Sequence, residues 1–283
     1  MKTARVVALV VPLAITGAGA FAFLSYRSAT KEAEAAWREI AATSEKATPR
    51  FDASLVADLP EVARRYFNHA IAPGTQLHTT VALEMRGIFL LGDKARPQPY
   101  EMTARQILSP PNAFVWIPQM RSGAIRISGS DGLVRGRAWT RFWLLGLVPV
   151  ANEAASPDLV RSATFRSTME GIWAPASLLP QRGVKWEQIG PDTARVTVES
   201  VSPAIVLHLT LGADGAVREA IGQRWSNANP QKAFRLQPFG GTVEAERSFG
   251  GFTIPSRLRI GNHYGTDDYL PFFQAEVTNA RYF

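Results

Sequence analysis

The chain contains no cysteine, and this one absence excludes several kinds of site. None of its 283 residues can form a disulfide, act as a catalytic thiol, bind a metal through a thiolate or carry a lipid on a lipobox cysteine. Histidine is also scarce, and the four histidines belong to no H-x-H or H-E-x-x-H pattern of the kind that marks a local zinc site. The sequence therefore predicts no metal site and no cofactor.

Motifs of the common enzyme classes are missing as well. There is no G-x-S-x-G nucleophile motif, no Walker A lysine motif and no G-x-G-x-x-G nucleotide fingerprint. Gly129-Ser130-Asp131-Gly132 comes nearest to a serine motif, and we interpret it as the turn of a hairpin between strands at 124–128 and 133–139. We therefore assign no catalytic residue, and the sequence favours a binding protein over an enzyme.

Acidic residues are outnumbered by basic ones, which gives a formal net charge of +7 at pH 7. The basic residues are spread along the chain, and only Arg64 and Arg65 are adjacent. Nucleic-acid binding is typical of basic runs or aromatic RNP-like motifs, and the sequence has neither. We expect no nucleic-acid partner. An attraction to anionic lipid headgroups, ~1 kcal/mol per basic residue near the surface, suits a domain tethered to a membrane.

Charged side chains are absent from residues 6–24, the one long apolar run of the chain. Basic residues flank the run on both sides, at Lys2, Arg5, Arg27 and Lys31. A helix of this length rises about 28 Å, close to the roughly 30 Å hydrocarbon core of a bilayer. A cleaved signal peptide is the alternative, because Ala18-Gly19-Ala20 resembles a cleavage site, but the apolar residues that follow favour an uncleaved anchor.

The anchor divides the chain into three parts. Residues 1–27 are the transmembrane anchor, and residues 28–53 are a helical stalk rich in Ala and Glu, with little apolar content beyond Trp37 and Ile40. Residues 54–283 are long enough for a single β-rich domain. If the short basic N-terminus stays in the cytoplasm, the protein is a single-pass membrane protein whose C-terminal domain is extracytoplasmic, either periplasmic or on the outer face.

The third part alternates apolar and polar residues from 81 to 86, and similar segments recur between Asp-Gly and Gly-Gly turns up to residue 283. Helices are expected at 58–71 and at 156–172, where Ser156 provides an N-cap. This pattern predicts a mainly β (α+β) domain with an antiparallel sheet of about eleven strands and two or three packed helices. The apolar segment 142–148 is too short to span a bilayer and could form an exposed lip that faces the bilayer or a partner.

Two motifs connect the chain to a known family. L-P-E-x-x-R-R-Y-F at 59–67 and R-x-x-x-E-x-x-W-x-P-x-x-L-L-P at 166–180 resemble motifs of an uncharacterised prokaryotic, membrane-anchored family of unknown function. The likeness covers residues 55–283 and implies no catalytic residue, because the family has no established activity. The order of strands and turns is also similar to lipoprotein-carrier (LolA-like) domains. That similarity implies a curved half-barrel around an apolar cavity covered by helices, although a fold does not fix a function.

Arg166 and Glu170 are the polar residues that we single out as a candidate site. Four positions apart, they share one helix face at the edge of an apolar stripe. Such a pair could hold a ligand headgroup or act as acid and base, and the alternative is a structural ion pair that ties the helix to the sheet. A LolA-like cavity would use Trp116, Trp143 and Trp173 as lining, although core packing is the ordinary role of such residues.

Three functions remain open on this basis. The first is a membrane-tethered, extracytoplasmic and non-catalytic domain that binds an apolar ligand, a lipid in the first instance. The second is a scaffold or interaction component of an envelope complex. The third is an enzyme of unrecognised type that uses Arg166 and Glu170.

Overall fold

The computed structural model describes residues 2–43, 49–153 and 155–283, and the side chains of the first helix from residue 22 onward. Its helices are α1 (Lys2–Thr43), α2 (Glu61–Ala70) and α3 (Pro157–Met169), with short 3-10 helices at Ala53–Val56, Glu170–Trp173, Pro175–Leu178 and Pro180–Arg182. Its strands are β1 (Val81–Leu91), β2 (Gln98–Ser109), β3 (Ala113–Ser122), β4 (Ile125–Val134), β5 (Arg137–Leu144), β6 (Val148–Glu153), β7 (Val184–Gln188), β8 (Thr193–Val198), β9 (Ile205–Leu211), β10 (Val217–Ser226), β11 (Arg235–Phe249), β12 (Phe252–Asn262) and β13 (Leu270–Tyr282).

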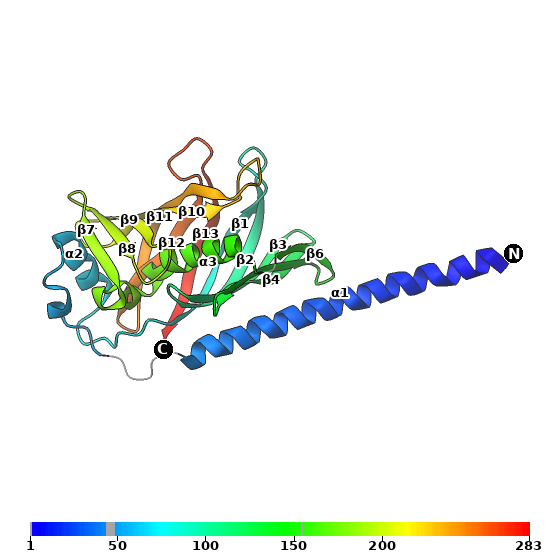
Figure 1. Cartoon of the computed structure of the whole chain (residues 1–283), viewed down its shortest axis with the longest axis horizontal. Coiled ribbons are helices and arrows are strands. Elements are labelled where there is room, and N and C mark those ends of the chain that lie inside the picture. The colour runs from blue at the N-terminus through cyan, green and yellow to red at the C-terminus, as the bar shows by residue number, and fades with distance from the viewer. Residues whose placement is uncertain (1, 44–48, 154) are drawn as a thin grey trace.

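These strands form one antiparallel sheet with the order β6-β5-β4-β3-β2-β1-β13-β12-β11-β10-β9-β8-β7. The order runs along the chain within each half, because successive strands are joined by hairpins. The sheet curves around α3, so it has an inner face toward α3 and an outer face on which α1 lies (Figure 1). The prediction of a mainly β fold built on a curved antiparallel sheet is confirmed.

The number of strands differs from the prediction, thirteen in place of about eleven within the described residues. The hairpin predicted at Gly129-Ser130-Asp131-Gly132 is wrong, because these residues lie inside β4. The chain turns instead at Arg135 and Gly136, whose φ angles of 50° and 69° suit a tight two-residue turn. The glycines in β4 serve close packing, since a Cβ on Gly132 would lie 2.3 Å from the ring of Trp139. The end of the apolar run that follows residue 142 forms β6, a strand that was not predicted.

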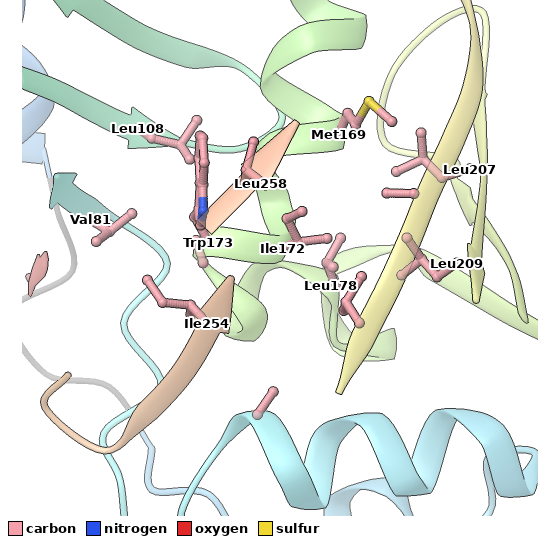
Figure 2. Packing of buried hydrophobic residues seen from close by; sticks show 14 of the residues in the cluster. Val81, Leu108, Met169, Ile172, Trp173, Leu178, Leu207, Leu209, Ile254 and Leu258 are labelled. Atoms are coloured by element: carbon pink, nitrogen blue, oxygen red, sulfur yellow. The ribbon is translucent and has the colours of Figure 1, made fainter. Parts of the chain in front are cut away.

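The main core lies between the inner face of the sheet and the segment that runs from α3 to residue 182. Trp173 is 2% exposed, and its indole N–H donates to the carbonyl oxygen of Pro255 at 2.9 Å. Figure 2 shows Trp173 with Ile172 and Leu178 among buried side chains of several strands. Ser156 caps α3 as predicted, accepting the backbone N–H of Leu159 at 3.1 Å. The core thus fixes α3 across the inner face.

The segment predicted as a stalk, residues 28–53, does not stand apart from the sheet. Up to Thr43 it continues α1, and its buried face packs on the outer face of β2, β3 and β4. The buried residues of this face are Ala29, Ala33 and Ile40. Glu32 and Glu39 pair with Arg141 and Arg135 at 2.6 and 2.5 Å, and Glu34 pairs with Arg105. The two small alanines let the helix approach the strands closely, which explains how a segment with few large apolar residues can pack.

No helix among the residues with described side chains is long and apolar enough to cross a bilayer. Most of the apolar run at residues 6–24 lies outside those residues, so the anchor stays a prediction. In Figure 1 the N-terminal half of α1 extends well beyond the sheet.

Candidate functional site

A cavity of about 530 Å³ lies between α3 and the inner face of the sheet. Its walls come from β1, β3 to β6, β10 to β13, α3 and the 3-10 helix Glu170–Trp173. Fifteen of its twenty lining residues are apolar, and the volume is within the range of about 300–1,000 Å³ that is common for sites of small ligands. The cavity can therefore take an apolar molecule of ordinary size.

Trp116 is at the centre of the aromatic part of the wall. Its ring centroid is 5.8 Å from that of Phe89, 6.1 Å from that of Phe142 and 6.2 Å from that of Phe273. These partners come from β1, β5 and β13, so one side chain of β3 joins the two halves of the sheet. The indole N–H of Trp116 is buried and has no hydrogen-bond partner among the described residues.

A row of polar side chains crosses the inner face beside this aromatic wall. Gln106 of β2 is paired with Trp116, Trp116 with Asp131 of β4, and Asp131 with Thr140 of β5. Directly paired residues of neighbouring strands have their side chains on the same face. The register therefore places an amide, an indole, a carboxylate and a hydroxyl in one line, and α3 crosses above it.

Arg166 of α3 closes this row with two carboxylates. Its Nε donates to Glu170 Oε1 at 2.8 Å, and its Nη1 pairs with Asp131. The side chains of all three residues are at most 18% exposed. Burial works against the charge of the guanidinium, but Glu170 and Asp131 more than offset this and raise the pKa of Arg166 above its ordinary value. Arg166 therefore stays protonated.

Both carboxylates of the cluster are occupied. Glu170 Oε2 accepts the side-chain amide of Gln106 at 2.5 Å, and Asp131 Oδ1 accepts the hydroxyl of Thr140 at 3.0 Å. The remaining oxygen of each carboxylate faces Arg166. A general base needs an oxygen free to take a proton from a substrate. These contacts favour the structural alternative for Arg166 and Glu170, in which the pair ties α3 to the sheet.

A second arginine lines the cavity without such partners. The Nε of Arg224, on β10, donates to Ser162 Oγ at 3.1 Å, and the guanidinium lies 5.0 Å from the ring centroid of Phe239. No carboxylate oxygen of the described residues is within 4.0 Å of it. Burial, together with the charge of Arg166, lowers the pKa of Arg224 from 12.5 to about 10. Arg224 is therefore still charged at neutral pH.

The structure brings four of the five predicted site residues together. Arg166, Glu170, Trp116 and Trp173 all line the cavity. Trp143 does not, because side chains of β5 alternate and it points to the outer face, where its ring is 5.5 Å from that of Tyr26 in α1. That the four lining residues bind a ligand stays a prediction.

Two charged residues of the cavity escaped the sequence analysis. Asp131 was assigned to a turn, and only its recognition as a strand residue would have placed it opposite Trp116. Arg224 lies in β10, and nothing local in the sequence marks it as inward-facing. Within the described residues, no three histidine or carboxylate side chains gather closely enough to hold a metal ion.

Both sequence motifs lie within residues 49–275, most of the chain, which match a family model. The chain belongs to DUF6544, a family of unknown function. The resemblance to an uncharacterised family is thereby confirmed. No curated protein matches this DUF6544 chain.

Solved structures similar to this DUF6544 chain include three bacterial proteins. One is a LolA superfamily protein from Nitrosomonas europaea, with 9% identity, a TM-score of 0.36 and coverage of 78% of this chain and 91% of that one. Another, from Vibrio parahaemolyticus, is described as an outer membrane lipoprotein-sorting protein domain, with 8% identity, a TM-score of 0.39 and the same coverages. A DUF1329 family protein from Desulfovibrio piger has 9% identity, a TM-score of 0.38 and coverages of 78% and 90%. At these identities and TM-scores the similarities have no bearing on function.

Proposed function

We propose that this protein is a membrane-tethered, extracytoplasmic binding protein that holds an apolar ligand, a lipid in the first instance, in the cavity under α3. The observation that carries the proposal is the cavity itself: about 530 Å³, lined mainly by apolar and aromatic side chains, with four charged residues among them. Apolar cavities with a few convergent polar groups are the usual form of sites for small ligands.

The polar cluster supports binding over catalysis. Asp131 and Glu170 have their oxygens taken up by Arg166, Gln106 and Thr140. A reaction at this cluster would first have to break buried ion pairs, and removing one partner of such a pair costs about 3–5 kcal/mol. We therefore assign the cluster a positioning role, in which it holds α3 over the cavity.

An exposed apolar lip supports a position next to a membrane. We define the lip as five residues in or close to the turns of the β3–β4 and β5–β6 hairpins, exposed by 46–59%: Ile125, Leu145, Leu147, Val148 and Val150. Val150 also lines the cavity, so the lip reaches the cavity rim. On its other side the lip adjoins α1, since a Cβ on Gly146 would be 3.4 Å from the ring of Tyr26. The lip thus lies where α1 leaves the sheet toward the predicted anchor.

Lipid extraction tests the ligand. The full chain is purified in a mild detergent and extracted, and the extract is compared by mass spectrometry with that of two variants. Ala151→Trp fills the cavity from β6. Asn152→Trp places the same ring one residue further along β6, on the opposite face of the strand and outside the cavity. We expect one lipid class in near-stoichiometric amount from the wild type and from Asn152→Trp, and much less from Ala151→Trp. Equal lipid content in all three chains contradicts the proposal.

A reporter fusion tests the location. Alkaline phosphatase fused after Phe283 is active only outside the cytoplasm, so we expect active fusions in cells. An inactive phosphatase fusion, with a cytoplasmic reporter active at the same place, would refute the extracytoplasmic assignment.

The lip also suits the second candidate, a scaffold in an envelope complex, because large exposed apolar patches occur at protein interfaces. A photocrosslinker in place of Leu147 separates the two functions. Lipid adducts support the binding protein, and one reproducible protein adduct supports the scaffold.

A further inference from the structure

Arg224 is a charged group in an apolar cavity that leaves most of its hydrogen-bonding capacity unused. Of the five N–H donors of a guanidinium, only the one on Nε has a partner among the described residues, Ser162 Oγ. Its two Nη atoms remain partly accessible, because they have no partner in the part of the chain that the structure describes and yet do not belong to the fully buried polar atoms without one. Because Arg224 lines the cavity, these donors are available to a molecule inside it.

The neighbouring carboxylates do not satisfy these donors. Asp131 and Glu170 have a combined charge of −2 against the single charge of Arg166, so the cluster attracts Arg224 at a distance. Their oxygens nevertheless face Arg166, Gln106 and Thr140, and none is within 4.0 Å of Arg224. The attraction does not compensate for burial, which together with Arg166 keeps the pKa of Arg224 below its ordinary value.

A second donor faces the same shortage of acceptors. Trp116 is 4% exposed and lines the cavity, and its indole N–H has no partner among the described residues. Buried donors without an acceptor are rare in proteins, because each one costs the free energy of its lost contact with water. Trp116 therefore leaves an unsatisfied donor in the cavity wall, and Arg224 offers charged Nη donors to the cavity itself, which a ligand with acceptor oxygens would satisfy.

We propose that the cavity ligand is an amphiphile with an oxyanion headgroup, a carboxylate or a phosphate, which binds the Nη groups of Arg224 while its acyl chain lies along the aromatic wall. Arginine suits this role because its planar guanidinium can bind two oxygens of one carboxylate or phosphate. The inference rests on the proposed function, since it names the class of apolar ligand that the cavity holds.

The test compares a charged and a neutral ligand with the same chain. The probes are 9,10-dibromooctadecanoic acid and 9,10-dibromooctadecanol, whose bromines quench tryptophan fluorescence on contact, added to the full chain in detergent after removal of lipid. Inorganic phosphate is added as a competitor, to separate an amphiphile from a free oxyanion. We expect the acid to bind at least tenfold more tightly than the alcohol, and phosphate to leave the binding of the acid unchanged.

Three variants identify the residue responsible. Arg224→Gln should lower the affinity for the acid to that for the alcohol, while the affinity for the alcohol stays as in the wild type and shows that the cavity is intact. Arg224→Lys, which keeps the charge, should retain part of the preference. Arg161→Gln is the matched control, because the guanidinium of Arg161, on α3, stacks on Trp225 of β10 at 4.1 Å and Arg161 does not line the cavity.

The outcomes separate this inference from the proposed function. Equal binding of acid and alcohol by the wild type overturns the oxyanion while leaving the apolar ligand in place. A preference for the acid that survives in Arg224→Gln overturns the role of Arg224. Displacement of the acid by phosphate overturns the amphiphile and points to a site for free oxyanions. If neither brominated probe quenches, the proposed function fails, and this inference fails with it.

Discussion

Arg224→Met should make the lipid-free protein more stable. Burial and Arg166 lower the pKa of Arg224 from 12.5 to about 10. At about 1.4 kcal/mol per pH unit, this difference means that the charge of Arg224 costs the fold about 3 kcal/mol. Methionine keeps most of the volume but loses the hydrogen bond to Ser162 and the contact with Phe239, each about 1 kcal/mol. The net gain is about 1–2 kcal/mol in the free energy of unfolding.

The pH dependence of this gain has a definite sign. Between pH 10 and 12.5 the unfolded chain holds the proton of Arg224 more readily than the folded chain does. The cost of the charge is therefore fully present below pH 10 and disappears as the pH rises through this window. The stability difference between Arg224→Met and the wild type should accordingly be constant from pH 6 to pH 9 and smaller at about pH 11.

Urea unfolding of the full chain in detergent, after removal of lipid, measures the effect. A gain of this size corresponds to a rise of about 2–8 °C in Tm for a domain of this length. Arg161→Met serves as the control and should lose about 0.5–1 kcal/mol with its cation–π contact on Trp225. If Arg224→Met is instead less stable than the wild type by 1 kcal/mol or more, the guanidinium is already satisfied within the protein, and the reasoning about its free donors is wrong.

Three further predictions concern stability. Trp173→Ala should lower the free energy of unfolding by about 3–5 kcal/mol, because it empties a position that is 2% exposed, and a loss under 1 kcal/mol in urea unfolding would contradict the core described above. Arg166→Met should cost about 3–5 kcal/mol in the same assay, since two buried carboxylates lose their partner, and an unchanged midpoint would be incompatible with the ion pairs. Ala33→Leu should loosen α1 from the sheet and speed amide exchange at residues 29–41, whereas Ala35→Leu on the exposed side should not, and equal exchange in both variants would speak against the packing of α1.

Local patterns were sufficient to predict most of the sheet. The alternation at 81–86 and the cap at Ser156 depend on a few neighbouring residues, and both elements form as predicted. Gly129 and Gly132 misled because glycine is ambiguous in sequence: it marks turns, and it also marks places where another chain segment comes close. For β4 this segment is β5, because a Cβ on Gly129 would lie 2.0 Å from the carbonyl oxygen of Arg141 in β5.

The site was predictable only where its residues are near each other in the chain. Arg166 and Glu170 are four positions apart, so helical geometry alone indicated that they pair. Asp131 and Arg224 reach the same cavity from β4 and β10, and their meeting depends on how far the sheet curves. The orientation of Trp143 could not be predicted either. It depends on the residue at which the turn before β5 ends, because this sets which residues of β5 face inward.

The continuity of α1 has a mechanical consequence. The helix runs unbroken from Lys2 to Thr43, about 63 Å at 1.5 Å per residue, and its C-terminal half is clamped to the outer face of the sheet. A domain on a flexible linker can change its orientation relative to the membrane. A domain packed along a rigid helix keeps one orientation relative to that helix. If the helix is inserted in a bilayer, the cavity rim therefore keeps one orientation relative to the bilayer. A protein that carries a ligand between two membranes has to dissociate from the first membrane. If the protein is tethered as we propose, the packing of α1 on the sheet suits a binding protein that stays in place and to which the ligand must come.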